Sequence, residues 1–383
     1  MNNKSIYPGR LGIQQRVVPS YRVEFFDLLA GSCSGGMSIF AGDVRQEESI
    51  PTAGERLVAD YSKSKNHHFQ DIQSSYYFLW QSGFVKWLER WNPDALIVEA
   101  NPRYLSTFQG IRWMRSRGKP VIGWGLGVPE KSSTEIKGGS IFQVFRDFLW
   151  SRMLDQLDGL IAYSHKGAGE YKDLIDPAKM VFVAANAVAT RPVGSPPRRK
   201  SQFSGPPILL YVGRIQARKK LDYLIRACSN LPVGIQPVVW IVGDGPERSM
   251  LEELAKKIYP KVEFKGRRTG SELSEIFKRS DLFVLPGTGG LAVQEAMSYG
   301  LPVIVAEGDG TQNDLVSPDN GWLIPSHDQE SLEETLKIAF SDPTRLRAMG
   351  ETSFRIVQDD VNIEQMVQTF IEALNKIPTA GRH

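Results

Sequence analysis

Short apolar runs alternate with longer amphipathic stretches along almost the whole chain, and this alternation limits the fold more than any other feature. Runs such as Ile208–Val212 and Leu282–Leu285 are rich in Val, Leu and Ile, like strands that are buried on both faces of a sheet. The stretch Leu221–Ser229 instead carries its apolar residues at helical spacing. Alternation of strand and helix predicts parallel sheets wrapped by helices, which is an α/β class of doubly wound, Rossmann-like domains.

The alternation occurs twice, once in each half of the chain. The strands predicted in the first half are Gly12–Val18, Met37–Phe40, Ala95–Val98, Val121–Trp124, Gly159–Tyr163 and Met180–Val183, and the helices are Tyr21–Leu29, Ser75–Arg90, Leu105–Arg117, Phe142–Gln156 and Lys166–Leu174. Those predicted in the second half are the strands Ile208–Val212, Val238–Val242, Val262–Lys265, Leu282–Leu285, Pro302–Ala306 and Gly321–Ile324, and the helices Leu221–Ser229, Pro246–Lys257, Glu272–Arg279, Leu291–Tyr299 and Gln329–Phe340. Residues Arg45–Gln70 are polar and poorly periodic, which indicates a loop or an irregular insertion.

A chain of 383 residues fits two domains of similar size. The segment Arg191–Pro207 contains several prolines and glycines and cannot continue a helix or a central strand. We therefore predict an N-terminal domain over residues 1–192, a linker over 193–206 and a C-terminal domain over 207–360. The basic run at 198–200 indicates a solvated face of the linker. Ligands of such sheets bind beyond the carboxyl ends of the strands, so the expected active site is the cleft between the domains.

Composition and charge exclude several classes of protein. The 46 Lys and Arg residues oppose 43 Asp and Glu residues, and the resulting net charge of +3 does not predict nucleic-acid binding. The two cysteines, Cys33 and Cys228, exclude a disulfide framework and indicate a reducing compartment. No apolar run approaches the ~18 residues of a membrane span, and the first residues lack the apolar stretch of a signal peptide. We expect a cytoplasmic protein, with contact at the inner face of a membrane left open.

The segment Leu210–Lys220 runs from a buried strand into a helix and carries four cationic side chains after Gly213. Gly213 allows the backbone to turn sharply. Arg214 and Lys219 then fall where a strand end meets a helix start, a place suited to phosphate oxygens. An exposed basic loop without a ligand is the alternative, and this segment alone does not decide between the two.

A glycine-rich turn separates the strand that ends at Leu285 from a helix that begins near Gly290. Bare glycines let backbone N–H groups at a helix start approach a phosphate closely, where the helix dipole also favours negative charge. Glu295 falls about one turn into that helix, and a carboxylate there suits two hydrogen bonds from a ribose diol. The alternative is a tight turn followed by a surface glutamate.

Taken in order, these segments resemble the retaining nucleotide-sugar glycosyltransferases of family 4, which have the two-domain GT-B fold. The resemblance covers much of the second half of the chain. The first half is similar only in its general pattern and in Arg16–Phe26. The matching residues of the second half are Gly213-Arg214 with Lys219 and Asp222, Val242–Pro246, Val262–Gly266, Asp281–Pro286 and Glu295–Val303.

The resemblance implies a role for the matching residues. Arg214 and Lys219 are the expected catalytic residues, which grip the donor diphosphate and stabilise its charge as the glycosidic bond breaks. Glu295 is expected to bind the ribose hydroxyls. The other residues expected to bind the donor, at the phosphates, the sugar or the base, are Gly213, Gly266, Arg267, Gly287, Thr288, Gly289, Gly290 and Leu291.

Two residues depart from the family pattern. The family pairs Glu295 with a second glutamate, which contacts the donor sugar, at the position that Gly287 holds here. The lysine of the basic segment is usually followed by glycine, whereas this chain has Lys220. That lysine either adds phosphate affinity or points to solvent, and the sequence does not decide.

The resemblance implies a retaining, hexosyltransferase-type glycosyltransferase. Its partners would be a nucleotide-sugar donor and a glycan or lipid-linked acceptor in the biosynthesis of a bacterial polysaccharide, glycolipid or glycan. No metal or other cofactor is expected, since the chain has no Asp-x-Asp and its histidines show no ligand spacing. Three alternatives stay open: an epimerase or hydrolase of the same fold, a degenerate protein that only binds nucleotide sugars, and a dinucleotide oxidoreductase, whose Gly-x-Gly-x-x-Gly fingerprint is missing.

The first domain is expected to hold the acceptor. Tyr21 and Arg22 begin its first helix just beyond the first strand and would contact acceptor or phosphate, although a helix-surface charge is the other interpretation of Arg22. Helix Phe142–Gln156 has more large apolar residues than one core stripe needs, so it is either buried on two sides or faces a lipid-linked acceptor or a membrane. The amphipathic helix within residues 361–383 is expected to pack back on the first domain, as in similar proteins.

Overall fold

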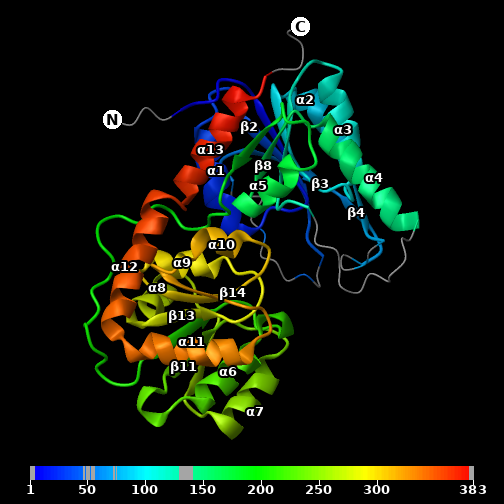
Figure 1. Ribbon diagram of the computed structural model, residues 1–383. Coiled ribbons are helices and arrows are strands. Elements are labelled where there is room, and N and C mark those ends of the chain that lie inside the picture. The colour runs from blue at the N-terminus through cyan, green and yellow to red at the C-terminus, as the bar shows by residue number, and fades with distance from the viewer. Residues whose placement is uncertain are drawn as a thin grey trace. The chain divides into compact units, whose positions relative to one another are not determined.

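The computed structural model describes residues 5–45, 48, 52, 57–71, 74, 76–128 and 141–378. The chain divides into two compact units: the first comprises residues 1–185 and 363–383, and the second residues 186–362 (Figure 1). Each unit has a parallel sheet with helices on both faces, so the doubly wound α/β architecture is confirmed. The boundary lies near residue 185 instead of 192, and residues 193–206 belong to the second unit.

The first unit is built on a seven-stranded parallel sheet in the order β3-β2-β1-β6-β7-β8-β9. Helices α2, α3, α4 and α5 cover one face of this sheet, and α1 and α13 cover the other (Figure 1). The rings of Phe25 on α1 and Phe370 on α13 meet at 5.0 Å. The strands are β1 Leu11–Gln15, β2 Met37–Gly42, β3 Asp60–Ser64, β4 Asn66–Phe69, β5 Phe78–Gln81, β6 Ala95–Glu99, β7 Val121–Gly125, β8 Gly159–Ala162 and β9 Met180–Val183, and the helices are α1 Val23–Gly31, α2 Phe84–Trp91, α3 Leu105–Arg115, α4 Ile141–Gln156, α5 His165–Lys172 and α13 Ile363–Lys376.

Two expectations for this unit were wrong. Residues Arg45–Gln70, expected to be irregular, contain β3 at the edge of the sheet and β4 in a two-stranded ribbon with β5. These strands are polar because each is partly exposed, so they lack the apolar run of a central strand. The helix expected over Ser75–Arg90 is strand β5 followed by α2, which begins after Gly83 at a φ of 84°. Ser75 itself, and residues 46–47, 49–51 and 53–56, lie outside the described residues.

The second unit is built on a six-stranded parallel sheet in the order β12-β11-β10-β13-β14-β15. Helices α6, α7 and α11 lie on one face and α8, α9 and α12 on the other (Figure 1). The strands are β10 Ile208–Val212, β11 Val238–Val242, β12 Val262–Gly266, β13 Leu282–Leu285, β14 Val303–Ala306 and β15 Gly321–Ile324, and the helices are α6 Leu221–Asn230, α7 Arg248–Ile258, α8 Gly270–Arg279, α9 Ala292–Ser298, α10 Thr311–Leu315, α11 Gln329–Ser341 and α12 Pro343–Asp359. The sequence pattern predicts all of these strands but neither α10 nor α12.

Glycines at the carboxyl ends of the strands let neighbouring loops pack backbone to backbone. The N–H of Gly213, after β10, donates to Val242 O at 3.0 Å, and the N–H of Gly243, after β11, donates to Gly266 O at 2.8 Å. A Cβ at Gly243 would overlap the carbonyl of Gly213, and one at Gly245 would overlap the carbonyl of Ile215. The loops that follow β10, β11 and β12 therefore form one joined surface.

The proline-rich segment 193–206 is fastened to the second unit by Arg199. Its guanidinium donates to four backbone carbonyls at the ends of α8 and α9, those of Phe277, Ser280, Tyr299 and Gly300, at 2.8–3.0 Å. Burial, and the nearby Arg347 guanidinium, lower the pKa of Arg199 to about 10, so the side chain is charged at neutral pH. The expectation of a solvated basic face holds for Arg198 and Lys200, which are exposed, and is wrong for Arg199.

Gln294 on α9 ties together the two places where the chain passes between the units. This side chain is 1% exposed. Its Oε1 accepts from the N–H groups of Val188 and Ala189 at 2.6 and 3.1 Å, and its Nε2 donates to Val361 O. One helix of the second unit therefore holds both the first and the last segment of that unit.

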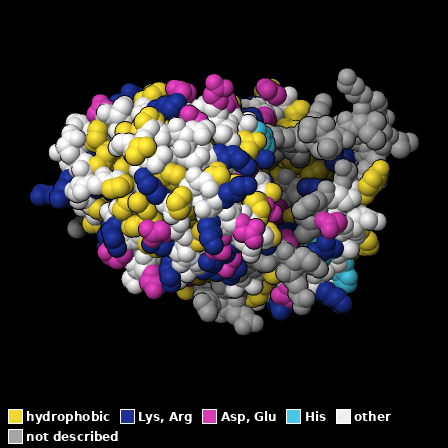
Figure 2. All heavy atoms as spheres, turned by 90° about the horizontal axis from the view of Figure 1, so that it is seen from below, with side chains coloured by type: hydrophobic (Ala, Val, Ile, Leu, Met, Phe, Trp, Pro, Cys, Tyr) yellow, Lys and Arg dark blue, Asp and Glu magenta, His cyan; other side chains and the backbone are white. Residues whose placement is uncertain are grey.

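The surface carries charges of both signs. Figure 2 shows Lys and Arg side chains interspersed with Asp and Glu over the face that it presents. This mixture is in keeping with the net charge of +3. It gives that face no extended block of one sign of the kind that attracts nucleic acid.

Replacing Arg199 by Met is expected to lower the free energy of unfolding by about 3 kcal/mol, because four buried carbonyls lose a charged donor. The matched control is Arg198→Met, at the exposed neighbouring position, for which we expect a change within about 0.5 kcal/mol. Urea unfolding of the whole chain measures both. Equal midpoints for the two variants would show that the Arg199 bonds add nothing to stability.

Candidate functional site

The candidate site lies at the carboxyl edge of the second sheet, where the loops that follow β10, β13 and β14 are neighbours. Strand β10 pairs with β13, and β13 pairs with β14, all in parallel. The basic segment 214–220 follows β10 and the glycine-rich turn 286–291 follows β13. The structure thus brings together the two segments that the sequence singled out, although they lie far apart in the chain.

Lys219 joins these two segments. Its side chain is only 6% exposed, and its Nζ donates to the carbonyl oxygens of Thr288 at 2.6 Å and Gly289 at 3.0 Å. Burial, and then the Arg218 guanidinium, lower the pKa of Lys219 to about 8, while Asp309 opposes them. An ammonium group has three N–H donors, so one remains for a further acceptor such as a phosphate oxygen.

Gly287 has no room for a side chain. A Cβ there would lie 2.6 Å from the Cα of Lys219 and would overlap the carbonyl oxygen of Arg218. The N–H of Thr288 donates to that same carbonyl at 3.2 Å, which holds the turn against the basic segment. At the position of the family's other glutamate this chain therefore has no room for a side chain, because the basic segment fills the space next to Gly287.

The turn then presents backbone N–H groups. Gly289 and Gly290 have φ values of 68° and 140°, which favour glycine, and α9 begins two residues later. Among the residues that the structure describes, none accepts a hydrogen bond from the N–H groups of Gly289, Gly290 or Leu291. Three successive donors without a partner suit an anion.

Glu295 lies in the first turn of α9 and is half-buried. Burial raises the pKa of its carboxyl group. No described residue donates a hydrogen bond to this carboxylate or pairs with it. A half-buried carboxylate that lacks a partner among the described residues is suited to hydroxyl donors of a ligand.

The other predicted donor residues are placed less tightly. Arg214 is half-buried, and its carbonyl accepts from the Tyr211 hydroxyl at 3.0 Å. Gly266 ends β12, which is an edge strand two places from β10, and the exposed Arg267 follows it. Lys220 has a left-handed φ of 52°, and its ammonium lies 5.2 Å from the centre of the Tyr223 ring. Its amine thus contacts a neighbouring ring, which neither interpretation of Lys220 anticipated.

Two further side chains at this edge escaped the sequence analysis. Arg218 is exposed, and its Nη1 lies 3.4 Å from Thr288 O. Asp309, in the loop after β14, acts on the charge of Lys219. The run of four cations was a signal for Arg218, but nothing in the sequence around Asp309 links it to a lysine ninety residues earlier.

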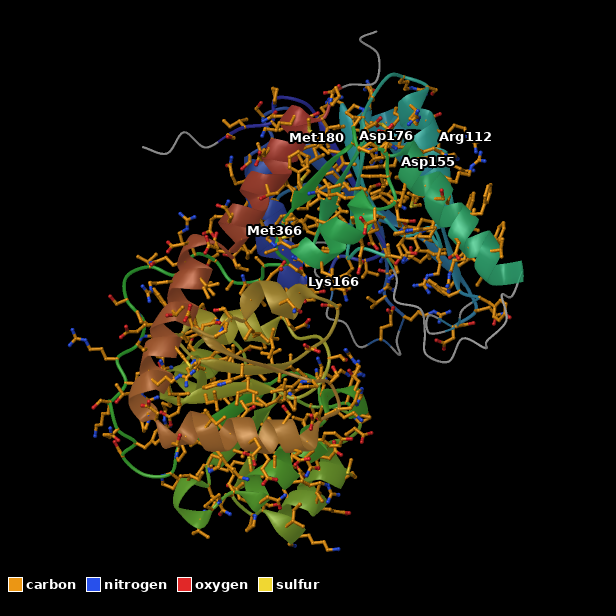
Figure 3. All side chains as sticks on the ribbon, viewed as in Figure 1. Arg112, Asp155, Lys166, Asp176, Met180 and Met366 are labelled. Atoms are coloured by element: carbon orange, nitrogen blue, oxygen red, sulfur yellow. The ribbon has the colours of Figure 1, made fainter. Side chains whose placement is uncertain are left out.

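In the first unit, Tyr21 is exposed and Arg22 is 5% exposed. The Arg22 guanidinium lies 5.5–6.0 Å from the ring centres of Tyr21, Phe25, Trp124 and Tyr163. Its Nη1 is 3.6 Å from the sulfur of Met366, which Figure 3 labels on α13. The interpretation of Arg22 as a helix-surface charge is therefore wrong, because the aromatic side chains enclose it.

Helix α4 buries some of its large apolar residues and exposes others. Trp150, Met153 and Leu154 are buried, whereas Val144 and Phe148 are 64% and 56% exposed. The expectation of burial on two sides is wrong for the first half of the helix, and the side chain of Phe142 lies outside the described residues. No described helix is both long enough and apolar enough to cross a membrane.

A metal centre has no obvious position in the described part of the chain. Within it, no group of three or more His, Cys, Asp or Glu side chains is arranged to hold a metal ion. The edge of the second sheet presents cationic side chains, backbone N–H groups and carboxylates.

Replacing Gly287 by Ala is expected to lower the free energy of unfolding by about 1–3 kcal/mol, because the new methyl group forces the basic segment away from the turn. Gly205→Ala is the control, since a Cβ at Gly205 meets nothing within 4 Å. Thermal and urea unfolding compare the two. If G287A is as stable as G205A, the turn can accommodate a methyl group at position 287, and the predicted overlap with the basic segment is wrong.

The affinity for a nucleoside diphosphate, the ligand that the resemblance implies, is expected to fall as the pH rises above 8. Lys219 with a pKa of about 8 loses its charge there, and linkage then weakens binding by up to about tenfold per pH unit. K219M should bind more weakly at pH 7 and show no such slope, whereas K220M should keep it. Calorimetric titration between pH 7 and 9.5 measures this, and the same slope in K219M would remove Lys219 from the site.

The part of the chain that contains the candidate site is similar in sequence to known proteins. Residues 196–355 match the family model for glycosyl transferases group 1. The sulfoquinovosyl transferase of Arabidopsis thaliana is 34% identical over 154 residues, or 38% of this chain and 29% of that protein. The D-inositol 3-phosphate glycosyltransferase of Rhodococcus opacus is 28% identical over 331 residues, or 79% of this chain and 68% of that protein. Some matches thus span well under two thirds of the relative's own length.

Solved structures are similar along the whole chain. Anabaena HepE, solved in complex with UDP, has a TM-score of 0.71 at 14% identity and covers 96% of this chain and 99% of its own. The sucrose-phosphate synthase of Thermosynechococcus elongatus has a TM-score of 0.70 at 17% identity, covering 96% and 98%. The fold of this chain is therefore that of the GT-B glycosyltransferases, and the family match over residues 196–355 together with the relatives supports the family of glycosyl transferases group 1.

Proposed function

We propose that this protein transfers a sugar from a nucleoside-diphosphate donor to an acceptor. The observation that carries the proposal is the carboxyl edge of the second sheet. There the Lys219 ammonium has one N–H donor that is not hydrogen-bonded to the described residues. Three N–H groups of the glycine-rich turn, and the half-buried Glu295 carboxylate, also lack a hydrogen-bond partner among the described residues. These are the groups that a diphosphate and a ribose diol require.

The chemistry would be electrostatic. As the glycosidic bond breaks, negative charge grows on the leaving diphosphate, and Arg214, Lys219 and the turn N–H groups stabilise it. We propose that cationic side chains do this without a divalent metal, and that the sugar keeps its anomeric configuration. The leaving phosphate would itself accept the proton of the attacking hydroxyl, so no side-chain base is needed.

The names of the relatives support this substrate class. One from Corynebacterium glutamicum, 29% identical over 194 residues, is named a GDP-mannose-dependent mannosyltransferase acting on a monoacylated phosphatidylinositol monomannoside. HepE has also been solved with UDP-glucose. For this chain we propose a nucleotide-sugar donor and a glycan or lipid-linked acceptor, in a cytoplasmic setting.

We further propose peripheral contact with a membrane through α4. Val144, Phe145 and Phe148 are 64%, 47% and 56% exposed, which is unusual for three large apolar side chains within five residues of one helix. A face of this kind can enter the boundary between lipid headgroups and acyl chains. It would hold the enzyme near a lipid-linked acceptor.

The proposal is tested with wild type and E295A against UDP, GDP, ADP and their sugars, in EDTA. One nucleotide family is expected to raise the melting temperature of the wild type, because a ligand that binds the folded state alone stabilises it. E295A is expected to bind that nucleotide about 1–3 kcal/mol more weakly, the range for a hydrogen bond to a charged group. Glu253→Ala, on the exposed surface of α7, is the control and should bind like the wild type.

The outcomes separate the alternatives. A flat panel contradicts the donor site as a whole, and unchanged binding by E295A removes Glu295 from it. Release of free nucleotide from the bound nucleotide sugar without an acceptor would indicate a hydrolase, and a changed sugar on the nucleotide would indicate an epimerase. Binding without turnover in the presence of acceptors would indicate a degenerate protein.

A further inference from the structure

Next to the proposed donor site lies a carboxylate, that of Asp309, to which the proposed function gives no role. Asp309 stands in the loop that follows β14, and the paired residues Leu285 and Val305 give its position. Gly289 and Asp309 each lie four residues beyond that pair, on adjoining loops of the same sheet edge. Asp309 thus lies on the loop next to the turn that presents the N–H donors.

Only one of the two oxygens of the Asp309 carboxylate accepts hydrogen bonds from the described residues. Its Oδ1 accepts from the N–H of Thr311 at 3.1 Å and from the Thr311 hydroxyl at 2.6 Å. Its Oδ2 has no hydrogen-bond partner among the residues that the structure describes, and the side chain is exposed. One oxygen fixes the carboxylate in place, and the other is open to a ligand.

Asp309 also lies close enough to Lys219 to act on it, since its charge raises the pKa of that lysine. Glu307, the other carboxylate of the same loop, has no such effect. A negative charge near Lys219 repels a diphosphate, so phosphate binding does not explain why a carboxylate lies there. An ionised carboxylate only accepts hydrogen bonds, and the donors that a nucleotide sugar offers are its hydroxyl groups.

We propose that Asp309 accepts hydrogen bonds from hydroxyl groups of the donor's sugar and so helps to select that sugar. This assignment rests on the proposed function. Glu295 lies on α9, after the turn, and is assigned to the ribose, and Gly287 has no room for a side chain, so the turn itself supplies no carboxylate to the sugar. The loop of the next strand supplies one instead.

The test compares a nucleoside diphosphate with its sugar-bearing form by calorimetry, using UDP with UDP-glucose and GDP with GDP-mannose. Asp309→Asn keeps the oxygen that accepts from Thr311 and removes the charge. D309N is expected to bind the nucleotide sugar about tenfold more weakly, while binding the diphosphate as well as the wild type or better. Asp309→Glu keeps the charge and displaces the oxygens, and should also weaken only the nucleotide sugar.

Glu307→Gln is the matched control and should change neither affinity, and melting temperatures show whether each variant is folded. Equal effects of D309N on both ligands would make Asp309 merely a counterion of Lys219 and overturn the assignment, as would no effect on either. A wild type that binds neither member of either pair would contradict the proposed function first. Binding by the wild type with unaltered selectivity in both Asp309 variants overturns this assignment alone.

Discussion

Close contact between backbones at the carboxyl edge of the second sheet determines much of what this chain can do. The loops after its parallel strands touch through carbonyls and N–H groups, and glycine is required where they touch. Side chains at Gly243, Gly245 or Gly287 would push the loops apart. The loop after β13 also touches the loop after β10, so the functional groups on these two loops are held close together. Preorganisation of this kind lets an enzyme stabilise charge without rearranging itself during the reaction.

The glycine-rich turn itself holds the ammonium group of Lys219. Thr288 and Gly289 occupy two of the donors of Lys219 with their carbonyl oxygens, which keeps a buried ammonium satisfied. The Lys219 ammonium is thus held in place and partly desolvated before any phosphate binds to it. The same burial that lowers its pKa makes its charge sensitive to conditions, so the amine is a strong anion ligand only while it is protonated.

Much of this arrangement could be read from the sequence, since apolar runs report strands buried on both faces. All six strands of the second sheet follow from such patterns, and the turn from its glycines. A shared phosphate site for Lys219 and the turn was implied only by the family resemblance. Strands β3 and β4 were missed because partly exposed strands carry no such run, and α10 because its five residues are too few to show a period. Burial of Arg22 and the nearness of Asp309 to Lys219 arise from contacts between distant segments, which one sequence does not reveal. The reason for Gly287 belongs to the same class, because it depends on a carbonyl sixty-nine residues earlier.

Gln294 has a mechanical consequence for donor binding. It sits next to Glu295 on the same helix, and its amide grips both chain segments that lead to and from the first unit. A displacement of α9 therefore pulls on Val188, Ala189 and Val361 together, since one buried amide is hydrogen-bonded to all three. The proline-rich segment that follows adds little slack, because Arg199 fixes it to the ends of α8 and α9. A ligand that displaces the first turn of α9 would thus also displace the two chain segments, at Val188–Ala189 and at Val361, that connect the second unit to the first.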